Sequence, residues 1–303
     1  MVDITHKTPS LRIAIAQATL QVSEQATIEA IKNRKVPKGD VLEAARIAGL
    51  FAAKRTADMI PDCHPLPIEF TEIRFQISTL TIHIEVEIHT IYKTGVEVEA
   101  MHAASVVALT MYDMLKPLDK GISIEKISLK EKKGGKSDRI PAIQSTIEAA
   151  VIVCSDTIAK GMNEDRAGKQ LIMQLEKMKV KVKDYVIIAD EIAAIQAQVQ
   201  HQVAQKRALV IFTGGTGLAP RDVTPEAIIP LLEKRVAGIE EAIRSYGQMR
   251  TPYAMLSRSV VGLIQQTLIM AVPGSTKGAE DAIKAVFPAV LHIFEVIEGK
   301  RHD

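Results

Sequence analysis

The sequence contains no tryptophan, and aromatic residues make up only 4% of its 303 positions. Proteins that bind single-stranded nucleic acid stack bases on aromatic side chains, and nucleic-acid binders in general carry a basic excess. Here 38 Lys and Arg residues nearly balance 36 Asp and Glu residues, which leaves a formal net charge of +2. We therefore expect no nucleic-acid partner.

Cysteine and long apolar runs are also scarce. The two cysteines, Cys63 and Cys154, cannot form a disulfide framework or a four-thiolate metal site, and such usage is typical of a reducing compartment. No run approaches the ~18 unbroken apolar residues that would span a bilayer. Residues 1–20 carry His6, Lys7 and Arg12 and no apolar core of a signal peptide. The sequence predicts a cytoplasmic protein without a membrane partner.

The length and the local composition predict two domains. A chain of 303 residues exceeds one typical core, and 47% hydrophobic with 24% charged residues is an ordinary globular composition. Residues 131–145 are charged, contain adjacent glycines and a proline, and show no periodicity, as is typical of a linker. We expect a first domain over residues 1–138, a linker over 139–145 and a second domain over 146–303.

The first half mixes helical and alternating patterns. Asp40 can cap a helix that extends toward Ile60, where the run 61–65 contains two prolines and ends it. Residues 82–89 alternate apolar and polar side chains, which indicates a strand with one buried face. A second helix over 99–116 and a strand over 122–129 follow. The pattern predicts an α+β domain, ferredoxin-like, in which helices cover one face of an antiparallel sheet.

The second half contains short, continuously apolar runs at 149–154, 185–188, 208–212 and 268–272, several of them separated by helical segments. Such runs are typical of strands buried on both faces. We expect an α/β domain of three layers around a mostly parallel sheet. In sheets of this kind ligands bind beyond the carboxyl ends of the strands.

Polar and glycine-rich segments follow each of these runs. Glycines 214, 215 and 217 allow main-chain N–H groups to converge on an anion, and Ser275 precedes a helix that could bind a phosphate. Asp190 and Asp222 offer the hard oxygen ligands that Mg²⁺ prefers, with a nucleotide completing its shell. Each segment alone could be a plain tight turn, but four of them at one sheet edge predict a binding site.

These segments resemble the molybdopterin-binding family over residues 146–299. The resemblance is carried by Ser155-Asp156, Asp165-Arg166-Ala167-Gly168, Asp190-Glu191, Gly214-Gly215-Thr216-Gly217, Arg221-Asp222-Val223-Thr224-Pro225-Glu226 and Pro273-Gly274-Ser275. It implies an adenylyltransferase that attaches AMP from Mg-ATP to the terminal phosphate of molybdopterin. It further implies that Asp190 and Asp222 hold Mg²⁺, and that pterin and nucleotide are bound by Ser155, Asp156, Gly214, Gly215, Thr216, Gly217 and Ser275. Ala167 departs from the serine of the family pattern.

Two other interpretations of the second half stay open. Some members of that family bind the pterin without demonstrated catalysis, so the domain could be a pterin-binding scaffold. A scaffold has no need of metal-binding carboxylates, and the presence of both Asp190 and Asp222 favours catalysis. A generic nucleotide-binding α/β protein would explain the glycine loop but leaves the first half unexplained.

In the first half, Asp113 and Lys116 stand three positions apart and share one face of the predicted helix. An acid next to an ammonium can exchange protons with a substrate, although a solvated surface pair is the common alternative. His64 could be a turn histidine bonded to main chain. Alternating His and Glu residues at 83–89 favour a solvated sheet face over a metal site. Gly134-Gly135-Lys136-Ser137 is not a P-loop, because Lys130 stands where that motif requires glycine.

Ordered blocks across residues 1–138 resemble cyclic pyranopterin monophosphate synthase; among them are Lys38-Gly39-Asp40-Val41, Ile60-Pro61-Asp62-Cys63-His64-Pro65, Lys93-Thr94-Gly95-Val96-Glu97-Val98-Glu99-Ala100 and Gly134-Gly135-Lys136-Ser137. Members rearrange cyclised dihydro-GTP to the cyclic pyranopterin with release of diphosphate, without a cofactor. The resemblance makes Asp113 the catalytic acid or base and Lys116 its partner. It places Lys38, Lys54, Asp62, Cys63, His64, Glu97, Val98 and Glu99 at the substrate. Asp62 replaces an apolar residue of the pattern.

Together the two resemblances imply a fused, bifunctional enzyme of molybdenum cofactor synthesis. Its partners would be the cyclised dihydro-GTP and molybdopterin, and its cofactors Mg²⁺ and ATP in the second domain alone. The families further imply a homo-oligomer, with a hexameric first domain whose sites lie between subunits and a trimeric second domain. The two reactions are not consecutive, because sulfur is inserted between them.

Overall fold

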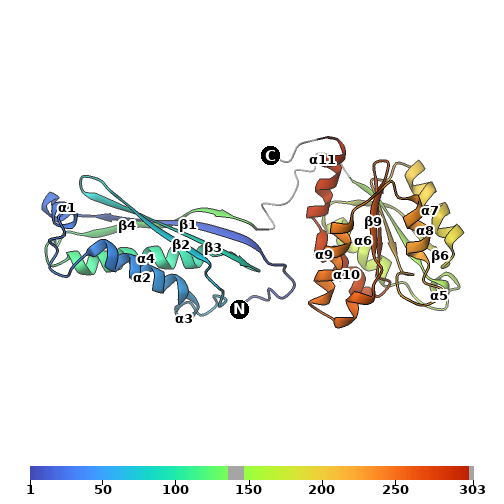
Figure 1. Ribbon diagram of the computed structural model, residues 1–303, viewed down its shortest axis with the longest axis horizontal. Coiled ribbons are helices and arrows are strands. Elements are labelled where there is room, and N and C mark those ends of the chain that lie inside the picture. Colours follow the sequence, from blue (N-terminus) through green and yellow to red (C-terminus); the bar gives the residue numbers. More distant parts are fainter. Residues whose placement is uncertain (136–146, 300–303) are drawn as a thin grey trace. The chain divides into compact units, whose positions relative to one another are not determined.

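The computed structural model describes residues 1–135 and 147–299 (Figure 1). The chain divides into two compact units, Met1–Arg139 and Ile140–Asp303. The expected linker at 139–145, and Lys136 and Ser137 of the glycine-lysine segment, lie outside the described residues.

The first unit follows the chain order β-α-β-β-α-β, with the first helical position filled by three helices. Its sheet has the strand order β2-β3-β1-β4, and every neighbouring pair is antiparallel. This order is that of the ferredoxin-like fold, so the predicted α+β class is confirmed. The elements are β1 (Ser10–Gln21), α1 (Gln25–Lys32), α2 (Val41–Lys54), α3 (Thr56–Met59), β2 (Phe70–Ile77), β3 (Thr81–Tyr92), α4 (Glu97–Leu115) and β4 (Ser123–Lys133).

The core of this unit lies between the sheet and helices α2 and α4, which cover one face (Figure 1). Alternate residues of the central strand β1, Ala14 to Leu20, are buried against the helices. Gly49 lets α2 approach α4 closely, because a Cβ there would lie 2.5 Å from Val107 Cγ2. The sequence pattern did not indicate β1, whose outward positions include Ile13 and Ile15 and therefore break the apolar–polar alternation.

The second unit has a sheet with the strand order β6-β5-β7-β10-β9-β8. The first four strands are parallel neighbours, and β9 and β8 are added antiparallel at one edge. The predicted mostly parallel sheet is therefore confirmed, and the two edge strands are an addition to it. The strands are β5 (Glu148–Cys154), β6 (Lys181–Ile188), β7 (Leu209–Thr213), β8 (Lys234–Arg235), β9 (Val260–Ile264) and β10 (Thr267–Val272).

Helices cover both faces of this sheet and bury two separate apolar clusters, which makes three layers (Figure 1). Successive residues of β5 contribute to opposite clusters, as a strand buried on both faces requires: Val151 to one and Ile152 to the other. Helices α6, α9 and α10 pack on one face and α7 and α8 on the other. The helices are α5 (Asp156–Ala159), α6 (Ala167–Lys177), α7 (Ile192–Ala204), α8 (Thr224–Ile228), η2 (Ile229–Leu231), α9 (Ala237–Gln248), η3 (Pro252–Leu256), α10 (Thr276–Val286), η4 (Ala289–His292) and α11 (Ile293–Ile297).

Within the described ranges, no helix combines the length and the apolar character that crossing a membrane would require.

Candidate functional site

In the first unit, Asp113 lies between two ammonium groups at the carboxyl end of α4. Lys38 Nζ is 2.7 Å from Asp113 Oδ2, and Lys116 Nζ is 2.8 Å from Oδ1. Lys38 precedes α2, whose first turn is capped as predicted, because Asp40 Oδ1 accepts a hydrogen bond from the amide of Glu43 at 3.2 Å. Since α2 runs antiparallel to α4, its start meets the end of α4.

This arrangement is more than a local helix pair, because Lys38 comes from a distant part of the chain. Hydrogen bonds from Lys116 and Lys38 lower the pKa of Asp113 to about 2, and the bond to Asp113 raises the pKa of Lys116. The three groups are partly exposed, with 52% of the Asp113 side chain accessible. The cluster can therefore present both an ionised carboxylate and protonated amines to a ligand.

A second group of the predicted residues lies near the start of α4. Cys63 Sγ donates a hydrogen bond of 3.0 Å to Glu99 Oε1. Burial, together with the bond to Glu99, raises the pKa of Cys63 to about 12. Glu99 is only 2% exposed, and burial raises its pKa. Lys54, the last residue of α2, is exposed at this end of the helix pair.

Within one chain, the residues predicted to bind substrate therefore lie in two groups, one near each end of α4. Glu99 and Asp113 are separated by about 21 Å along the axis of α4, at ~1.5 Å per residue. Val98 is 44% exposed, while Asp62 and His64 contact the first residues of the chain. Asp62 Oδ1 lies 2.9 Å from the amino group of Met1, and His64 Nε2 lies 2.8 Å from the carbonyl oxygen of Val2.

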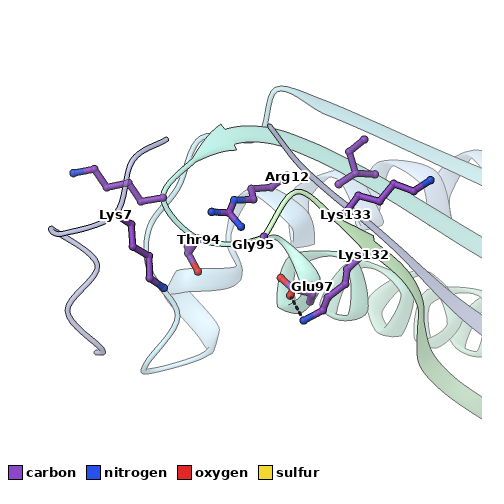
Figure 2. Close-up of a pocket in the computed structure, with 10 residues that line it drawn as sticks. Lys7, Arg12, Thr94, Gly95, Glu97, Lys132 and Lys133 are labelled. Carbon is purple, nitrogen blue, oxygen red and sulfur yellow. Dashed lines mark ion pairs between the residues drawn. The ribbon is translucent and has the colours of Figure 1, made fainter. Parts of the chain in front are cut away.

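A cationic cavity of about 220 Å³ opens beside the amino end of α4 (Figure 2). Figure 2 shows Lys132 of β4 reaching toward the predicted residue Glu97, with Nζ 3.3 Å from Oε1. The basic residues around the cavity come from β1, from β4, from the segment before β1 and from the loop between β3 and α4: Lys7, Arg12, Lys93, Lys132 and Lys133. Basic side chains in this number suit a multiply charged phosphate ligand. None of these five residues was assigned to a site from the sequence. Lys93 only begins the block 93–100, and the other four belong to distant segments outside the quoted motifs.

The alternating His and Glu residues of β3 form a charged sheet face. Arg74 Nη2 lies 2.6 Å from Glu85 Oε1 and 2.7 Å from Glu87 Oε2, and Glu85 also pairs with Lys130. His89 Nε2 lies 2.8 Å from the other oxygen of Glu87. Glu85 and Glu87 thus form ion pairs with Arg74 and Lys130 in a network on the surface of the sheet.

In the second unit, a cavity of about 590 Å³ lies at the carboxyl ends of β5, β6, β7 and β10. The sequence placed its candidate residues at this edge, and several of them line the cavity: Ser155, Asp190, Gly214, Gly215 and Asp222. Gly274 and Thr276, on either side of Ser275, line it as well.

Asp190 and Asp156 hold each other through their main chains. The Asp156 amide donates to Asp190 Oδ2 at 3.1 Å, and the Asp190 amide donates to Asp156 Oδ1 at 3.2 Å. Arg221 Nε and Nη2 lie 2.9 and 2.5 Å from Asp156 Oδ2. The other oxygen of Asp190, Oδ1, is buried and has no hydrogen-bond partner among the described residues. Burial, together with the nearby carboxylates of Asp156 and Asp222, raises the pKa of Asp190.

These two carboxylates could hold a divalent cation together with a ligand that completes its shell; among the described residues, no group of three or more His, Cys, Asp or Glu side chains is arranged as a metal site. A buried carboxylate oxygen without a donor is costly unless a ligand takes it up, and Asp222 contributes a second carboxylate to the same cavity. Asp222 Oδ2 accepts a hydrogen bond of 2.8 Å from the amide of Ala219. Gly215 keeps the space beside Asp190 open, because a Cβ at Gly215 would lie 3.0 Å from Asp190 Oδ1.

The remaining predicted residues surround this cavity in other roles. Ser155 and Ser275 cap helices α5 and α10 by accepting amide hydrogen bonds at 3.4 and 3.1 Å. Thr216 is 4% exposed, and the carbonyl oxygens of Thr216 and Gly217 accept hydrogen bonds from Arg258. Arg258 was not found from the sequence, because it follows no glycine-rich motif.

At Ala167, where the family pattern has serine, Asp165 caps α6. Its carboxylate accepts from the amides of Gly168 and Lys169 at 2.9 and 3.2 Å, and from the hydroxyl of Tyr185 at 2.7 Å. Ala167 itself lines the cavity. The start of α6 therefore keeps its capping bonds without the serine hydroxyl.

Comparison with known proteins assigns a family to each half. The sequence model of the MoaC family matches residues 1–135, and a model described as "probable molybdopterin binding domain" matches residues 150–292. The first half is also similar to a cyclic pyranopterin monophosphate synthase of Nitratidesulfovibrio vulgaris, with 49% identity over 139 residues, 45% of this chain and 86% of the relative.

Two relatives match the whole chain, and both are called molybdenum cofactor biosynthesis bifunctional protein. One, from Chlorobaculum tepidum, is 38% identical and covers 100% of this chain and 96% of its own length. The other, from Synechococcus elongatus, is 37% identical, with 100% and 98% covered. The resemblances found in the sequence are thereby confirmed, and with them the prediction that the chain is an enzyme. The chain belongs to the family of bifunctional proteins of molybdenum cofactor biosynthesis.

Proposed function

We propose that the first domain converts cyclised dihydro-GTP to cyclic pyranopterin monophosphate and releases diphosphate. The observation that supports this most directly is the carboxylate of Asp113 between the ammonium groups of Lys38 and Lys116. Opening a purine ring and closing a cyclic phosphate require protons to be moved, and an ionised carboxylate beside protonated amines can both accept and donate them. Closure forms a P–O bond to the α-phosphorus and breaks the bond to the bridging oxygen, so that diphosphate leaves.

The triphosphate of the substrate needs cations, and the cavity around Lys132 offers them. In one chain this cavity is lined by Glu97 at the start of α4, while Asp113 lies near the end of α4, about 24 Å away along the helix at ~1.5 Å per residue. A substrate of nucleotide size that used both groups would have to lie between two copies of the chain. This separation supports a homo-oligomer with sites between subunits, and we propose a hexameric first domain and a trimeric second domain, which are compatible when their threefold axes coincide.

We propose that the second domain transfers AMP from Mg-ATP to the terminal phosphate of molybdopterin. A phosphate oxygen of the pterin forms a bond to the α-phosphorus of ATP, and the bond to the bridging oxygen breaks with departure of diphosphate. The supporting observation is the unpartnered oxygen Asp190 Oδ1, which is buried beside a cavity that Asp222 also lines. When bound there, Mg²⁺ would neutralise phosphate charge that develops in this transfer.

The chain's own groups would orient the reactants. Gly214 and Gly215 have positive φ angles of 109° and 60°, and their lack of side chains lets main-chain groups approach a phosphate. Asp190 and Asp222 would hold the cation. The Asp156 carboxylate, which pairs with Arg221, accepts a hydrogen bond from the Asp190 amide and so fixes the main chain there. A pterin-binding scaffold is the second candidate, since the glycine and hydroxyl residues that line the cavity, such as Gly214, Ser155 and Thr276, could hold a pterin without a cation.

The decisive experiment measures both activities on one purified chain. We expect the wild type to form cyclic pyranopterin and to transfer AMP to molybdopterin. Asp113→Asn should abolish the first activity and leave the second intact, and Asp222→Asn should do the reverse, with affinity for Mg-ATP reduced more than affinity for molybdopterin. Tight binding of molybdopterin without AMP transfer by the wild type would make the second domain a carrier. Near-normal pterin formation by Asp113→Asn would remove the role given to Asp113.

A further inference from the structure

Arg258 lies between η3 and β9 and forms hydrogen bonds to three residues of the distant loop 216–222. Its main-chain amide donates to the carbonyl of Thr216 at 2.9 Å. In its side chain, Nε donates to the carbonyl of Gly217 at 2.8 Å and Nη2 donates to the carbonyl of Asp222 at 2.6 Å, while Nη1 pairs with Glu226. One residue thus holds both ends of the segment 216–222.

The position of the Asp222 carboxylate depends on this segment. The Asp222 amide donates to the carbonyl of Ala219 at 2.8 Å, and the Ala219 amide donates back to Asp222 Oδ2 at 2.8 Å. Gly217 lies against the same carboxylate, since a Cβ at Gly217 would be 2.8 Å from Oδ2. A shift of the main chain at either residue 217 or residue 222 would therefore move the carboxylate.

The chemistry of the guanidinium group suits this task. A planar guanidinium directs several N–H groups at fixed angles, so it can bind two carbonyls and a carboxylate at once, whereas a lysine ammonium is a point charge. Glu226 takes up the positive charge, and the bonds to residues 217 and 222 go to main-chain oxygens. The cation therefore holds the loop without forming an ion pair with the Asp222 carboxylate. Arg258 is not among the residues that line the cavity.

We propose that Arg258 is a positioning residue of the second domain. It fixes the segment 216–222 so that the Asp222 carboxylate shares the cavity with the unpartnered oxygen of Asp190, and so sets the affinity of this pair for a divalent cation with its nucleoside triphosphate. The part of this inference that concerns the cation rests on the proposed adenylyl transfer. The part that concerns the loop does not.

Two measurements on the full-length chain test the inference. Amide hydrogen exchange of peptides covering residues 214–223 reports on the loop without any ligand, and binding of Mn²⁺, followed by electron paramagnetic resonance, reports on the carboxylates. For Arg258→Met we expect at least tenfold faster exchange in this segment and at least tenfold weaker binding of Mn²⁺. The matched control is Arg244→Met, because Arg244 also donates to a neighbouring main-chain carbonyl, that of Ser259 at 3.3 Å, but does not contact the loop. It should change both quantities less than twofold.

The two measurements test two separate claims, the fixing of the segment 216–222 by Arg258 and the effect of Arg258 on cation binding. Unchanged exchange in Arg258→Met would overturn the positioning role, and faster exchange with unchanged Mn²⁺ affinity would overturn its connection to the carboxylates. Absence of Mn²⁺ binding by the wild type would contradict the metal site of the proposed function and the cation part of this inference, while exchange still decides the loop part. Should Arg258→Met fail to fold, Arg258→Lys gives the answer: lysine can replace at most part of the bonding, so both effects should persist in weaker form, and wild-type values would overturn the proposal.

Discussion

Lys38 Nζ lies 2.7 Å from the Oδ2 atom of Asp113 and 2.9 Å from its main-chain oxygen, although the two residues are 75 positions apart. The Lys38 ammonium therefore donates both to a main-chain carbonyl in the last turn of α4 and to the last acidic side chain of that helix. A cation at the carboxyl end of a helix also interacts favourably with the helix dipole. The relationship joins the residue expected to bind substrate to the residue expected to move protons.

Replacing Lys38 with Met should raise the pKa of Asp113 from about 2 toward its ordinary value of ~3.9, because one of the two ammonium groups that stabilise the carboxylate is lost. Carbon-detected NMR of the carboxyl group measures this directly. A depressed carboxyl pKa in the folded state contributes stability that is present above pH ~4 and lost as the pH falls toward 2. Acid unfolding of Lys38→Met should therefore lose part of this dependence.

Lys54→Met is the control for this experiment. Lys54 is also a predicted substrate-binding residue, but it ends α2 and so lies at the opposite end of the helix pair from Asp113. Its replacement should leave the pKa of Asp113 where it is. If both variants shift that pKa equally, a general charge effect accounts for it and the specific contact does not.

Replacing Glu99 with Gln should make Cys63 more reactive. Burial is the main reason that the thiol pKa is raised to about 12, and the Glu99 carboxyl adds to it through a hydrogen bond and its charge. Removal of that charge should lower the pKa and speed alkylation by iodoacetamide at pH 9 about threefold or more, since the thiolate is the reactive form. The other cysteine, Cys154, is 2% exposed. We replace it with Ala in both the reference protein and the Glu99→Gln protein, so that Cys63 is the single thiol measured. Slower or equal alkylation of the Glu99→Gln protein would contradict this account.

More of the residues proposed for the second unit lie together in one cavity than of those proposed for the first, and this has a physical reason. Asp190, Gly215 and Asp222 follow parallel strands, and the carboxyl ends of parallel strands meet at one edge of a sheet, so their proximity follows from topology. In the first unit the antiparallel sheet gives no such rule. The cavity basic residues Arg12 and Lys132 lie on β1 and β4, and only the strand order β2-β3-β1-β4 makes these strands neighbours.

Arg258 illustrates what local patterns omit. Its bonds go to main-chain carbonyls, and any residue in the loop would offer the same acceptors. Asp119 is a similar case in the first unit, because it binds the β1–α1 turn through the amides of Ser23 and Glu24. Neither residue lies in a sequence motif, and the role of each follows only from its hydrogen-bond distances in the folded chain.

Asp119→Ala should lower the free energy of unfolding of the first domain by about 2–4 kcal/mol, because the buried hydroxyl of Thr27 and several part-buried amides lose their common acceptor. Asp119 is 1% exposed and accepts from the Ser23 amide at 2.8 Å, the Thr27 hydroxyl at 3.2 Å and the Gly121 amide at 2.9 Å. Denaturant unfolding of the full chain, followed by a probe in the first domain, measures the change. Asp58→Ala, at an exposed position of α3, should change it by less than about 0.5 kcal/mol. A similar loss in both variants would argue against the network.

Gly215→Ala should abolish ligand binding in the second domain while the first domain keeps its activity. Gly215 has φ +60°, and an added Cβ would lie 2.4 Å from Thr224 Oγ1 and 3.0 Å from Asp190 Oδ1, inside the space that a cation or phosphate would occupy. Gly161→Ala is a matched control, because Gly161 has φ +69° and nothing within 4 Å of an added Cβ. Both variants carry the cost of a left-handed conformation, about 1–2 kcal/mol. Gly215→Ala must in addition displace the buried Thr224 hydroxyl, so it should lose more stability than Gly161→Ala. In calorimetry, only Gly215→Ala should lose binding of molybdopterin and Mg-ATP. An equal loss of binding in Gly161→Ala would assign the loss to backbone strain. Normal binding by Gly215→Ala would mean that ligands do not use the space beside Asp190.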